Sequence, residues 1–461
     1  MFNVKEINEA INGKILYNNN KIVDTISINS KEIKNNTLFI PIIGEKYDAN
    51  NFILDAIKNG CIASLISSNY EKKEEIVSEC KNNNITLIEV SDTLKALQDL
   101  AHYNRIKNKN TKVIAITGSN GKTTTKEIVY NTLKNKYNVL KTEGNLNNHI
   151  GLPLTLLKLN KHDVCVLEMG MNHFGEIEVL SKIAEPDMAI ITNIGTAHIG
   201  ILGSKDNILK AKMEITSGLK ENGILFINNN DEYLNKINLN THYTICRYGF
   251  DNNIKLFNDK DRNIIFFNGK KVDVSKVGEY PINAVLAYYI AKQFNINFNE
   301  FKKSIKTYQT PKMRNEKIKI KNNIIINDSY NANYDSMKSG IEKVIQNYSD
   351  KNYNLLLYLG DMLELGEWSK FYHEEIGKLI NNSKINMLYV TGNEIKYILK
   401  EINNPNINVK EFKSNENKSY IVDEIINELD KHKKNVIYFK GSRAIGLDKI
   451  VEELLIKLNN R

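Results

Sequence analysis

The sharpest chemical signal is a glycine-containing run at residues 117–124, TGSNGKTT, between an apolar segment and a helical pattern. A phosphate site needs N–H donors from a tight turn, a helix N-terminus, a positive charge and a hydroxyl for Mg²⁺. Gly118 and Gly121 can form the turn, Lys122 can supply the charge and Thr123 the hydroxyl. The strict pattern GxxxxGK(S/T) fails because isoleucine replaces its first glycine. We predict nucleotide binding; the alternative is a plain glycine turn entering a helix.

Polar side chains that could complete a metal site follow the next two apolar runs. Glu168 ends the run at 164–167, while Asn193 and His198 follow the run at 188–191. Ligands gather at the carboxyl edge of parallel sheets, and oxygen ligands suit Mg²⁺. A lone histidine is more often structural or exposed. His198, however, follows the third of three neighbouring strands whose ends carry polar residues, and this position favours a functional role.

One lysine shows where reasoning from the residues alone stops. Lys212 lies in the helical run ILKAKME at 208–214. Nothing in its spacing separates it from Lys205 or Lys210, so a surface helix position is the ordinary interpretation.

The elements that position these residues fall into three segments of the chain: residues 1–108, 111–308, and 311 onward. The first mixes short β-rich runs with helical stretches. The second begins as strand, loop and helix, and its continuous apolar runs are typical of a parallel sheet covered on both faces. In these first two segments we predict strands at 25–28, 37–40, 112–117, 164–167 and 188–191. We predict a helix at 122–134.

The third segment alternates strands and helices again, as in an open α/β sheet. Pro311, one of only six prolines, falls at the expected boundary. The predicted strands are 324–326, 355–359, 387–390 and 436–439, and the predicted helices are near 335–348, 370–381, 417–431 and 447–458.

Length and composition describe an ordinary globular chain of several domains. It has 461 residues, 41% hydrophobic and 25% charged, which argues against wholesale disorder. No apolar stretch approaches the roughly 20 residues of a membrane span, and we expect no signal peptide. The four cysteines are widely separated, so reduced thiols in the cytoplasm are expected.

The net charge of +9 does not make this a nucleic-acid-binding protein. Its lysines are interleaved with acids, and no zinc-finger spacing, RNA-binding signature or helix-turn-helix is recognisable. The one dense basic run, KHKK at 431–434, is expected to be a solvated loop. A basic surface can still attract anionic substrates.

Several motifs together resemble the Mur ligase family, ATP-dependent amide ligases of peptidoglycan precursor synthesis. TGSNGKTT is followed in the family's order by TEGNLNNHIGLP at 142–153, EMG at 168–170, the run 193–198 and AKME at 211–214. The C-terminal runs NDSYNANYDSM at 327–337, LGDMLELGE at 359–367 and KGSR at 440–443 are similar to one member. That member joins D-alanyl-D-alanine to UDP-N-acetylmuramoyl-tripeptide.

The resemblance spans residues from about 25 to 450 and implies an α/β chain of three domains. It implies a small α/β domain at 1–108 that binds the UDP-muramoyl-peptide, a central P-loop parallel-sheet ATPase domain at 109–310, and a C-terminal Rossmann-like ligase domain at 311–461. It also implies an acyl-phosphate mechanism. We expect UDP-N-acetylmuramoyl-tripeptide and D-alanyl-D-alanine as substrates, no nucleic acid or membrane span, and a cytoplasmic monomer.

The resemblance assigns roles residue by residue. Lys122, Lys212 and His198 would be catalytic, with Lys212 carbamylated so that it becomes a Mg²⁺ ligand. Two Mg²⁺ ions are expected, with Thr123, Glu168, His198 and Lys212 as ligands. ATP would contact Gly118, Ser119, Asn120, Gly121, Lys122, Thr123, Thr124, Asn283, Arg314, Asp328 and Asn331. The substrates would contact Ser30, Asn145, Asn147, Asn148, Tyr330 and Asn333.

The sequence departs from the family pattern at the uridine-binding motif. Asn29-Ser30-Lys31 replaces the usual Asp-Ser-Arg, although the phosphate and metal positions are intact. The alternatives are a Mur ligase that adds a single amino acid, folylpolyglutamate synthase, a nucleotide-gated binding protein without catalysis, and a P-loop kinase. The diaminopimelate-recognising DNPR motif is missing, and the run at 330–333 gives a kinase no support.

Overall fold

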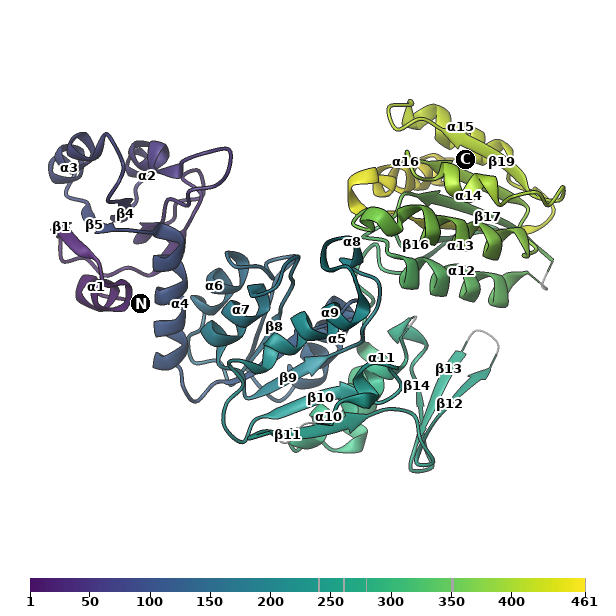
Figure 1. Cartoon of the computed structure of the whole chain (residues 1–461), viewed down its shortest axis with the longest axis horizontal. Helices are drawn as coiled ribbons and strands as arrows, with labels where there is room; N and C mark the ends of the chain where they lie inside the picture. Colours follow the sequence, from purple (N-terminus) through teal and green to yellow (C-terminus); the bar gives the residue numbers. More distant parts are fainter. Residues whose placement is uncertain (239–240, 260–261, 279, 350–351, 461) are drawn as a thin grey trace.

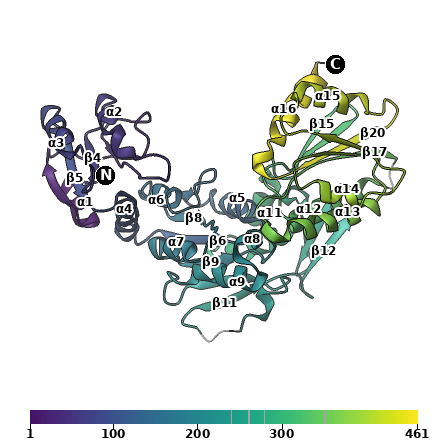
Figure 2. The ribbon, with the colours of Figure 1, turned by 45° about the horizontal axis from the view of Figure 1, so that its top comes forward.

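The computed structural model describes residues 1–238, 241–259, 262–278, 280–349 and 352–460. The chain forms three α/β domains in sequence order, with the central one between the other two (Figure 1). Figure 2 shows them as an open arch, with the N-terminal and C-terminal domains at opposite ends. The predicted fold class, α/β with three domains, is confirmed. The expected boundaries at 108 and 310 stay a prediction.

The N-terminal domain is a five-stranded sheet in the order β1-β5-β4-β3-β2, in which only β1 runs antiparallel to its neighbour. Its last helix, α4, packs against α6 and α7 and so connects this domain to the central one. The elements are α1 Val4–Ile11, β1 Lys14–Tyr17, β2 Thr25–Ser27, β3 Thr37–Phe39, η1 Ala49–Phe52, α2 Ile53–Lys58, β4 Ala63–Ser67, α3 Lys73–Asn82, β5 Thr86–Val90 and α4 Thr93–Lys107.

The central domain is built on a six-stranded parallel sheet in the order β11-β10-β9-β6-β8-β7. A three-stranded antiparallel sheet, β12-β13-β14, follows it in the chain. The first half comprises β6 Lys112–Thr117, α5 Lys122–Leu133, β7 Val139–Lys141, α6 Gly151–Leu156, β8 Val164–Glu168, α7 Glu176–Ala184, β9 Met188–Ile191, α8 Ile199–Leu202, α9 Lys205–Met213 and η2 Glu214–Thr216. The second half comprises β10 Ile224–Asn228, η3 Leu234–Lys236, β11 Thr244–Tyr248, β12 Ile254–Asp259, β13 Arg262–Phe267, β14 Lys270–Asp273, η4 Ser275–Val277, α10 Ile282–Gln293 and α11 Phe298–Thr307.

Both faces of the central sheet are buried, which explains its continuous apolar strands. On β6, Val113 and Ala115 join one hydrophobic core, whereas Ile114 and Ile116 join the other. The first core includes residues of α6, α7 and α9, and the second includes residues of α5, α10 and α11. Side chains alternate along a strand, so every second residue must satisfy a different core.

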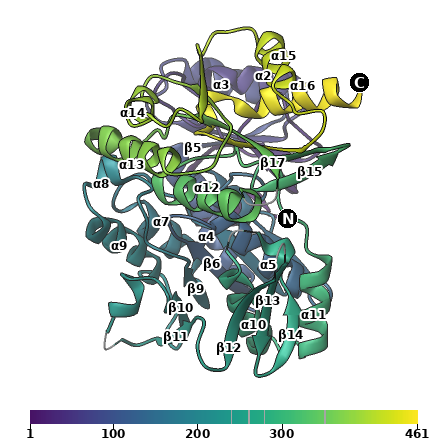
Figure 3. The same cartoon turned by 90° about the vertical axis from the view of Figure 1, so that its right-hand side faces the viewer.

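The C-terminal domain is a six-stranded sheet in the order β15-β16-β20-β17-β18-β19, parallel except for the edge strand β15. Helices α12 and α13 lie on the side that faces the central domain (Figure 3). The elements are β15 Glu316–Ile320, β16 Asn323–Asn327, α12 Tyr334–Tyr348, β17 Tyr353–Gly360, η5 Gly366–Trp368, α13 Ser369–Asn381, β18 Met387–Thr391, α14 Lys396–Lys400, β19 Asn408–Phe412, α15 Lys418–Asn427, β20 Lys434–Lys440, η6 Arg443–Ile445 and α16 Leu447–Asn459.

All the strands predicted from apolar runs are present within one or two residues of their expected bounds. The helix predicted at 417–431 is shorter, because α15 ends at Asn427 and residues 431–433 form an exposed loop. The four cysteines are free, as expected. Among the described residues, no helix has the length and apolar character that crossing a bilayer requires.

Candidate active site

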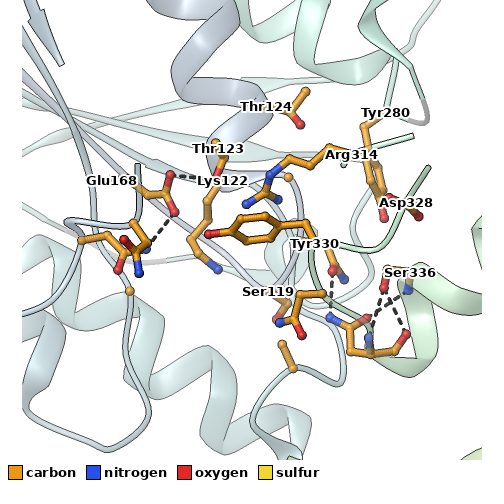
Figure 4. A pocket seen from close by; sticks show the side chains of 18 of the residues that line it. Ser119, Lys122, Thr123, Thr124, Glu168, Tyr280, Arg314, Asp328, Tyr330 and Ser336 are labelled. Carbon is orange, nitrogen blue, oxygen red and sulfur yellow. Dashed lines mark hydrogen bonds between the residues drawn. The ribbon is translucent and has the colours of Figure 1, made fainter. Parts of the chain in front are cut away.

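A cavity of about 370 Å³ lies where the central and C-terminal domains meet (Figure 4). Its central-domain wall comes from the carboxyl ends of β6 and β8 and from the loops after β7 and β9, the expected edge for ligands of a parallel sheet. Predicted site residues that line it are Ser119, Asn120, Gly121, Lys122, Thr123, Thr124, Asn145, Asn147, Asn148, Glu168, His198, Arg314, Asp328, Tyr330, Asn331 and Asn333.

The run at 117–124 forms a tight turn followed directly by α5, which begins at Lys122. Gly118 has φ +147°, and a Cβ there would collide with the Thr192 hydroxyl, so only glycine fits. Nζ of Lys122 donates a 2.8 Å hydrogen bond to the carbonyl of Gly118. Burial lowers the pKa of Lys122, an effect opposed by the nearby carboxylate of Glu168. The turn therefore places an ammonium group and a helix N-terminus at one point of the cavity wall.

The carboxylate of Glu168 lies beside this turn. It is the last residue of β8 and is buried. Oε2 accepts a 2.9 Å hydrogen bond from the hydroxyl of Thr123, and Oε1 accepts one of 2.9 Å from Nδ2 of Asn147. A hydroxyl and a carboxylate in contact, next to the turn predicted to bind phosphate, fit Mg²⁺, which is usually bound by one or two carboxylates together with phosphate oxygens.

The other two predicted metal ligands differ in placement. His198 lines the cavity, and its Nδ1 lies 3.2 Å from Oε2 of Glu364 in the C-terminal domain. Lys212, on α9, is only 1% exposed and is not among the cavity-lining residues. Burial, reinforced by Lys122, lowers the pKa of Lys212 well below its ordinary value. Among the described residues, no group of three His, Cys, Asp or Glu side chains is placed to hold a metal ion.

The C-terminal domain contributes a stacked pair and a buried ion pair. The guanidinium of Arg314 lies over the ring of Tyr330, 3.9 Å from its centroid, and both project into the cavity (Figure 4). Oδ2 of Asp328 accepts hydrogen bonds from Nζ of Lys440 at 2.5 Å and from the hydroxyl of Tyr438 at 3.1 Å. Oδ1 accepts the backbone N–H of Asn315 at 3.0 Å. Asp328 is therefore fixed in place at the cavity wall.

Two contacts join the turn region to the C-terminal domain. Nδ2 of Asn333 donates to Oδ1 of Asn120 at 2.8 Å, and Asn333 also caps α12 by accepting from the N–H of Ser336. Oδ2 of Asp335 accepts from the backbone and the hydroxyl of Thr196, in the loop after β9. The motif at 327–337 thus contacts the turn at 117–124 directly.

Four predicted site residues do not line this cavity. Gly118 belongs to the turn but does not line the cavity, and Lys212 is buried. Asn283, at the start of α10, lies close to Gly121, and its buried Nδ2 has no hydrogen-bond partner among the residues described. Ser30 is buried in the distant N-terminal domain.

Several side chains at the site were not predicted from the sequence. Lys126 reaches the carboxylate of Glu168, Glu364 reaches His198, and Asp335 holds Thr196. Lys126 recurs one helical turn after Lys122, a spacing that could have placed both on one face of α5. Glu364 and Asp335 belong to recognised motifs, but no spacing rule reveals contacts between domains.

The sequence of this chain is similar to those of known ligases. Residues 116–297 match the Mur ligase middle domain, and residues 313–443 match the Mur ligase, glutamate ligase domain. The chain is 34% identical to the UDP-N-acetylmuramoyl-tripeptide–D-alanyl-D-alanine ligase of Bacillus subtilis, over 98% of both chains. The protein belongs to the Mur ligase family. The resemblance seen in the motifs is thereby confirmed.

Solved structures of Mur ligases have the same architecture. MurF from Acinetobacter baumannii superimposes with a TM-score of 0.84 at 27% identity, covering 99% of both chains. MurF from Thermotoga maritima in complex with ADP gives a TM-score of 0.79 at 27% identity, covering 95% of this chain and 99% of that one. The three-domain arrangement is therefore that of known Mur ligases.

Proposed function

We propose that this Mur ligase joins D-alanyl-D-alanine to the peptide carboxylate of UDP-N-acetylmuramoyl-tripeptide, with conversion of ATP to ADP and phosphate, in cytoplasmic peptidoglycan precursor synthesis. The observation that carries this proposal is the shared cavity, where a phosphate-binding turn meets the C-terminal motif at 327–337. Full-length similarity to a ligase of that name supports the choice of substrates.

A carboxylate is a poor electrophile, so it must be activated before an amine can attack it. The tripeptide carboxylate attacks the γ-phosphorus of ATP, which forms an acyl phosphate and releases ADP. The amine of D-alanyl-D-alanine then attacks the acyl carbon, loses a proton, and expels phosphate. Stabilising the charge on the transferring phosphoryl group is the main demand of such chemistry.

The residues around the turn are suited to that demand. Lys122 and the N-terminus of α5 offset the charge of the phosphates. Arg314 adds a second positive charge from the C-terminal domain, and its stacking on Tyr330 limits the directions it can take. Asp328 and Asn331 contact the nucleotide, while Asn145, Asn147 and Asn148 face the peptide and phosphates. The N-terminal domain, with Ser30, binds the UDP-sugar.

The contact between Thr123 and Glu168 supports one of the two Mg²⁺ ions expected for this reaction. Thr123 and Glu168 would hold one ion, and His198 together with carbamylated Lys212 would hold the other. Carbamylation requires a neutral amine, and burial favours that form of Lys212. Mg²⁺ supplies positive charge against the phosphate oxygens during transfer.

The proposal is tested by phosphate release from ATP with UDP-N-acetylmuramoyl-tripeptide, in the presence and absence of D-alanyl-D-alanine. We expect release that depends on the dipeptide and a product with the mass of the pentapeptide. Release with single amino acids instead would assign the protein to another ligation step. ATP binding without turnover on either acceptor would contradict ligase activity.

A further inference from the structure

The loop at residues 145–150, called the asparagine loop below, has one side on the candidate metal site. On that side, Nδ2 of Asn147 donates a 2.9 Å hydrogen bond to Oε1 of Glu168. The carbonyl of Asn147 accepts the N–H of Gly170 at 2.8 Å, and a Cβ on Gly170 would lie 3.1 Å from the Asn147 side chain. Asn147 is therefore held closely against the end of β8, where it restricts the direction in which Glu168 can point.

The other side of the asparagine loop lies on the N-terminal domain. Nε2 of Gln98, on α4, donates a hydrogen bond of 3.1 Å to the carbonyl of His149. Ile150, the last residue of the loop, packs together with Leu154 of α6 against the hydrophobic core of the N-terminal domain. These four residues are not among those that line the active-site cavity. The N-terminal domain thus supports the loop from behind.

A short and stiff stretch of backbone connects the two sides of the loop. Asn147 and His149 are two residues apart, which limits their separation to about 7 Å. Between them, Oδ1 of Asn148 accepts the N–H groups of Ile150 at 3.2 Å and of Gly151 at 2.9 Å. These two bonds tie the loop to the first turn of α6. A shift of the His149 carbonyl therefore also moves Asn147.

Helix α4 is a firm support for this contact, because it belongs to both domains (Figure 1). Its first half packs in the core of the N-terminal domain. Near its other end, Nδ2 of Asn104 donates to the carbonyl of Leu156 at 2.8 Å. The buried Arg105 donates from Nε to the carbonyl of Ala184, also at 2.8 Å. Gln98 is thereby fixed in position relative to the central domain.

We propose that Gln98 is a positioning residue for the Mg²⁺ site at Glu168. By holding the carbonyl of His149 it fixes the asparagine loop, and Asn147 in turn directs the carboxylate of Glu168 towards the ion. Groups that orient a metal ligand from outside the coordination sphere commonly change the affinity for the metal. The inference rests on the proposed function, because it takes Glu168 to be a Mg²⁺ ligand. The N-terminal domain thereby takes part in metal binding from behind the loop.

The test measures the affinity for Mg²⁺ by calorimetry at saturating ADP in variants of Gln98. Gln98→Glu has nearly the same shape, but its carboxylate cannot donate to the carbonyl of His149. The dissociation constant for Mg²⁺ should therefore rise about three- to tenfold. Gln98→Lys restores a donor and should bind Mg²⁺ more tightly than Gln98→Glu. In the ligand-free protein, amide hydrogen exchange in segment 145–156 should be faster in Gln98→Glu than in the wild type.

A double-mutant cycle with Asn147→Ala separates positioning from a general structural effect. If Gln98 acts through Asn147, Gln98→Glu should weaken Mg²⁺ binding in the wild type but not further in the Asn147→Ala background. Lys95→Ala is the matched control, because the exposed Lys95 pairs with Asp99 on the same helix. This control should keep the wild-type affinity for Mg²⁺ and the wild-type exchange rates.

Two results would overturn the inference. One is an unchanged affinity for Mg²⁺ in Gln98→Glu, and the other is an equal loss with and without the Asn147 side chain. Glu168→Gln distinguishes these results from a failure of the proposed function. If Glu168→Gln binds Mg²⁺ as tightly as the wild type, Glu168 is not a ligand. The metal site of the proposed function would then be wrong, and the role of Gln98 with it.

Discussion

Oδ2 of Asp335 accepts a 2.7 Å hydrogen bond from the hydroxyl of Thr196, and this contact joins the C-terminal domain to the loop after β9. The same loop contains His198, and Gly195 has no side chain where Asp335 approaches it. Asp335 lies two residues from Asn333, which contacts Asn120 in the turn at 117–124. The two C-terminal residues thus bind the turn and the His198 loop together.

Replacing Asp335 with alanine should impair catalysis more than stability. Hydrogen bonds to a charged group contribute about 1.5–3 kcal/mol each, so loss of this contact should lower kcat/KM about ten- to a hundredfold. Steady-state kinetics and thermal melting would measure both effects. Asp206→Ala is the matched control, because Asp206 is exposed and also occupies the second position of a helix. Equal kcat/KM in the two variants would show that the Asp335 contact has no role in turnover.

The sequence predicted three strands of the central sheet, β6, β8 and β9, and four of the C-terminal sheet, β16, β17, β18 and β20, all of them largely buried. An apolar run such as 112–117 can satisfy two cores only as a central strand. The strands that were not predicted are β1, β4, β5, β7, β10, β11, β15 and β19 and the β12-β13-β14 sheet. β15 and the small sheet mix charged with apolar side chains, as the run EKIKI of β15 shows, so their sequences carry weaker signals.

Site residues were predictable where they follow a strong strand and unpredictable where burial depends on packing. Glu168 ends a strand that the sequence shows directly, and Lys122 begins the helix that follows another such strand across a short turn. Lys212 and Lys210 have similar neighbours, yet Lys212 is buried and Lys210 is exposed. Which face of α9 enters the core depends on how α9 packs against the sheet. Only the family resemblance could select Lys212.

Lys126 should contribute more to the stability of the ligand-free protein than to the stability of its complex with Mg²⁺ and ADP. Its buried Nζ donates to the carbonyl of Thr142 at 2.7 Å and lies 3.9 Å from Oε2 of Glu168. Lys126→Met removes one of the two lysine charges near that buried carboxylate, Lys122 being the other, at a cost of up to about 3–5 kcal/mol. Mg²⁺ bound at Glu168 would restore a positive charge beside the carboxylate. The Tm of Lys126→Met should therefore rise more on addition of Mg²⁺ and ADP than the Tm of the wild type does.

The control for this prediction is Lys141→Met. Lys141 pairs with Glu127 at 2.6 Å, as Lys126 also does at 3.3 Å, but no contact joins it to Glu168 in the described structure. Its Tm increment with Mg²⁺ and ADP should match the wild type. An increment for Lys126→Met no larger than that for Lys141→Met would show that Lys126 does not balance the charge of Glu168.

Lys212→Ala should lose activity by about 10²–10³-fold if the modified lysine stabilises charge in the reaction. Short carboxylates such as formate or acetate should partly restore turnover, since they can occupy the space of the missing carbamate. Lys210→Ala, on the exposed side of the same helix, should keep full activity and show no response to carboxylates. Full activity of Lys212→Ala without added carboxylate would exclude the proposed role.

His373 should make the C-terminal domain sensitive to mild acid. Burial lowers its pKa, and its Nε2 accepts the N–H of Met362 at 3.2 Å while Nδ1 faces the carbonyl of Ser369 at 2.8 Å. Only the neutral ring can accept from Met362, which precedes Glu364 in the same loop. The unfolded chain binds the proton more readily, so stability falls as the pH drops below the ordinary histidine value of about 6.5 towards the lowered pKa.

Thermal melting between pH 7.5 and 5.5 would measure this effect. His373→Gln can still accept from Met362 but cannot be protonated in this range, so its Tm should decline less steeply than that of the wild type. His242→Gln serves as the control, because the exposed His242 lies in the loop before β11 of the central domain. If His373→Gln and the wild type lost Tm equally over this range, the acid sensitivity would have to arise from other groups.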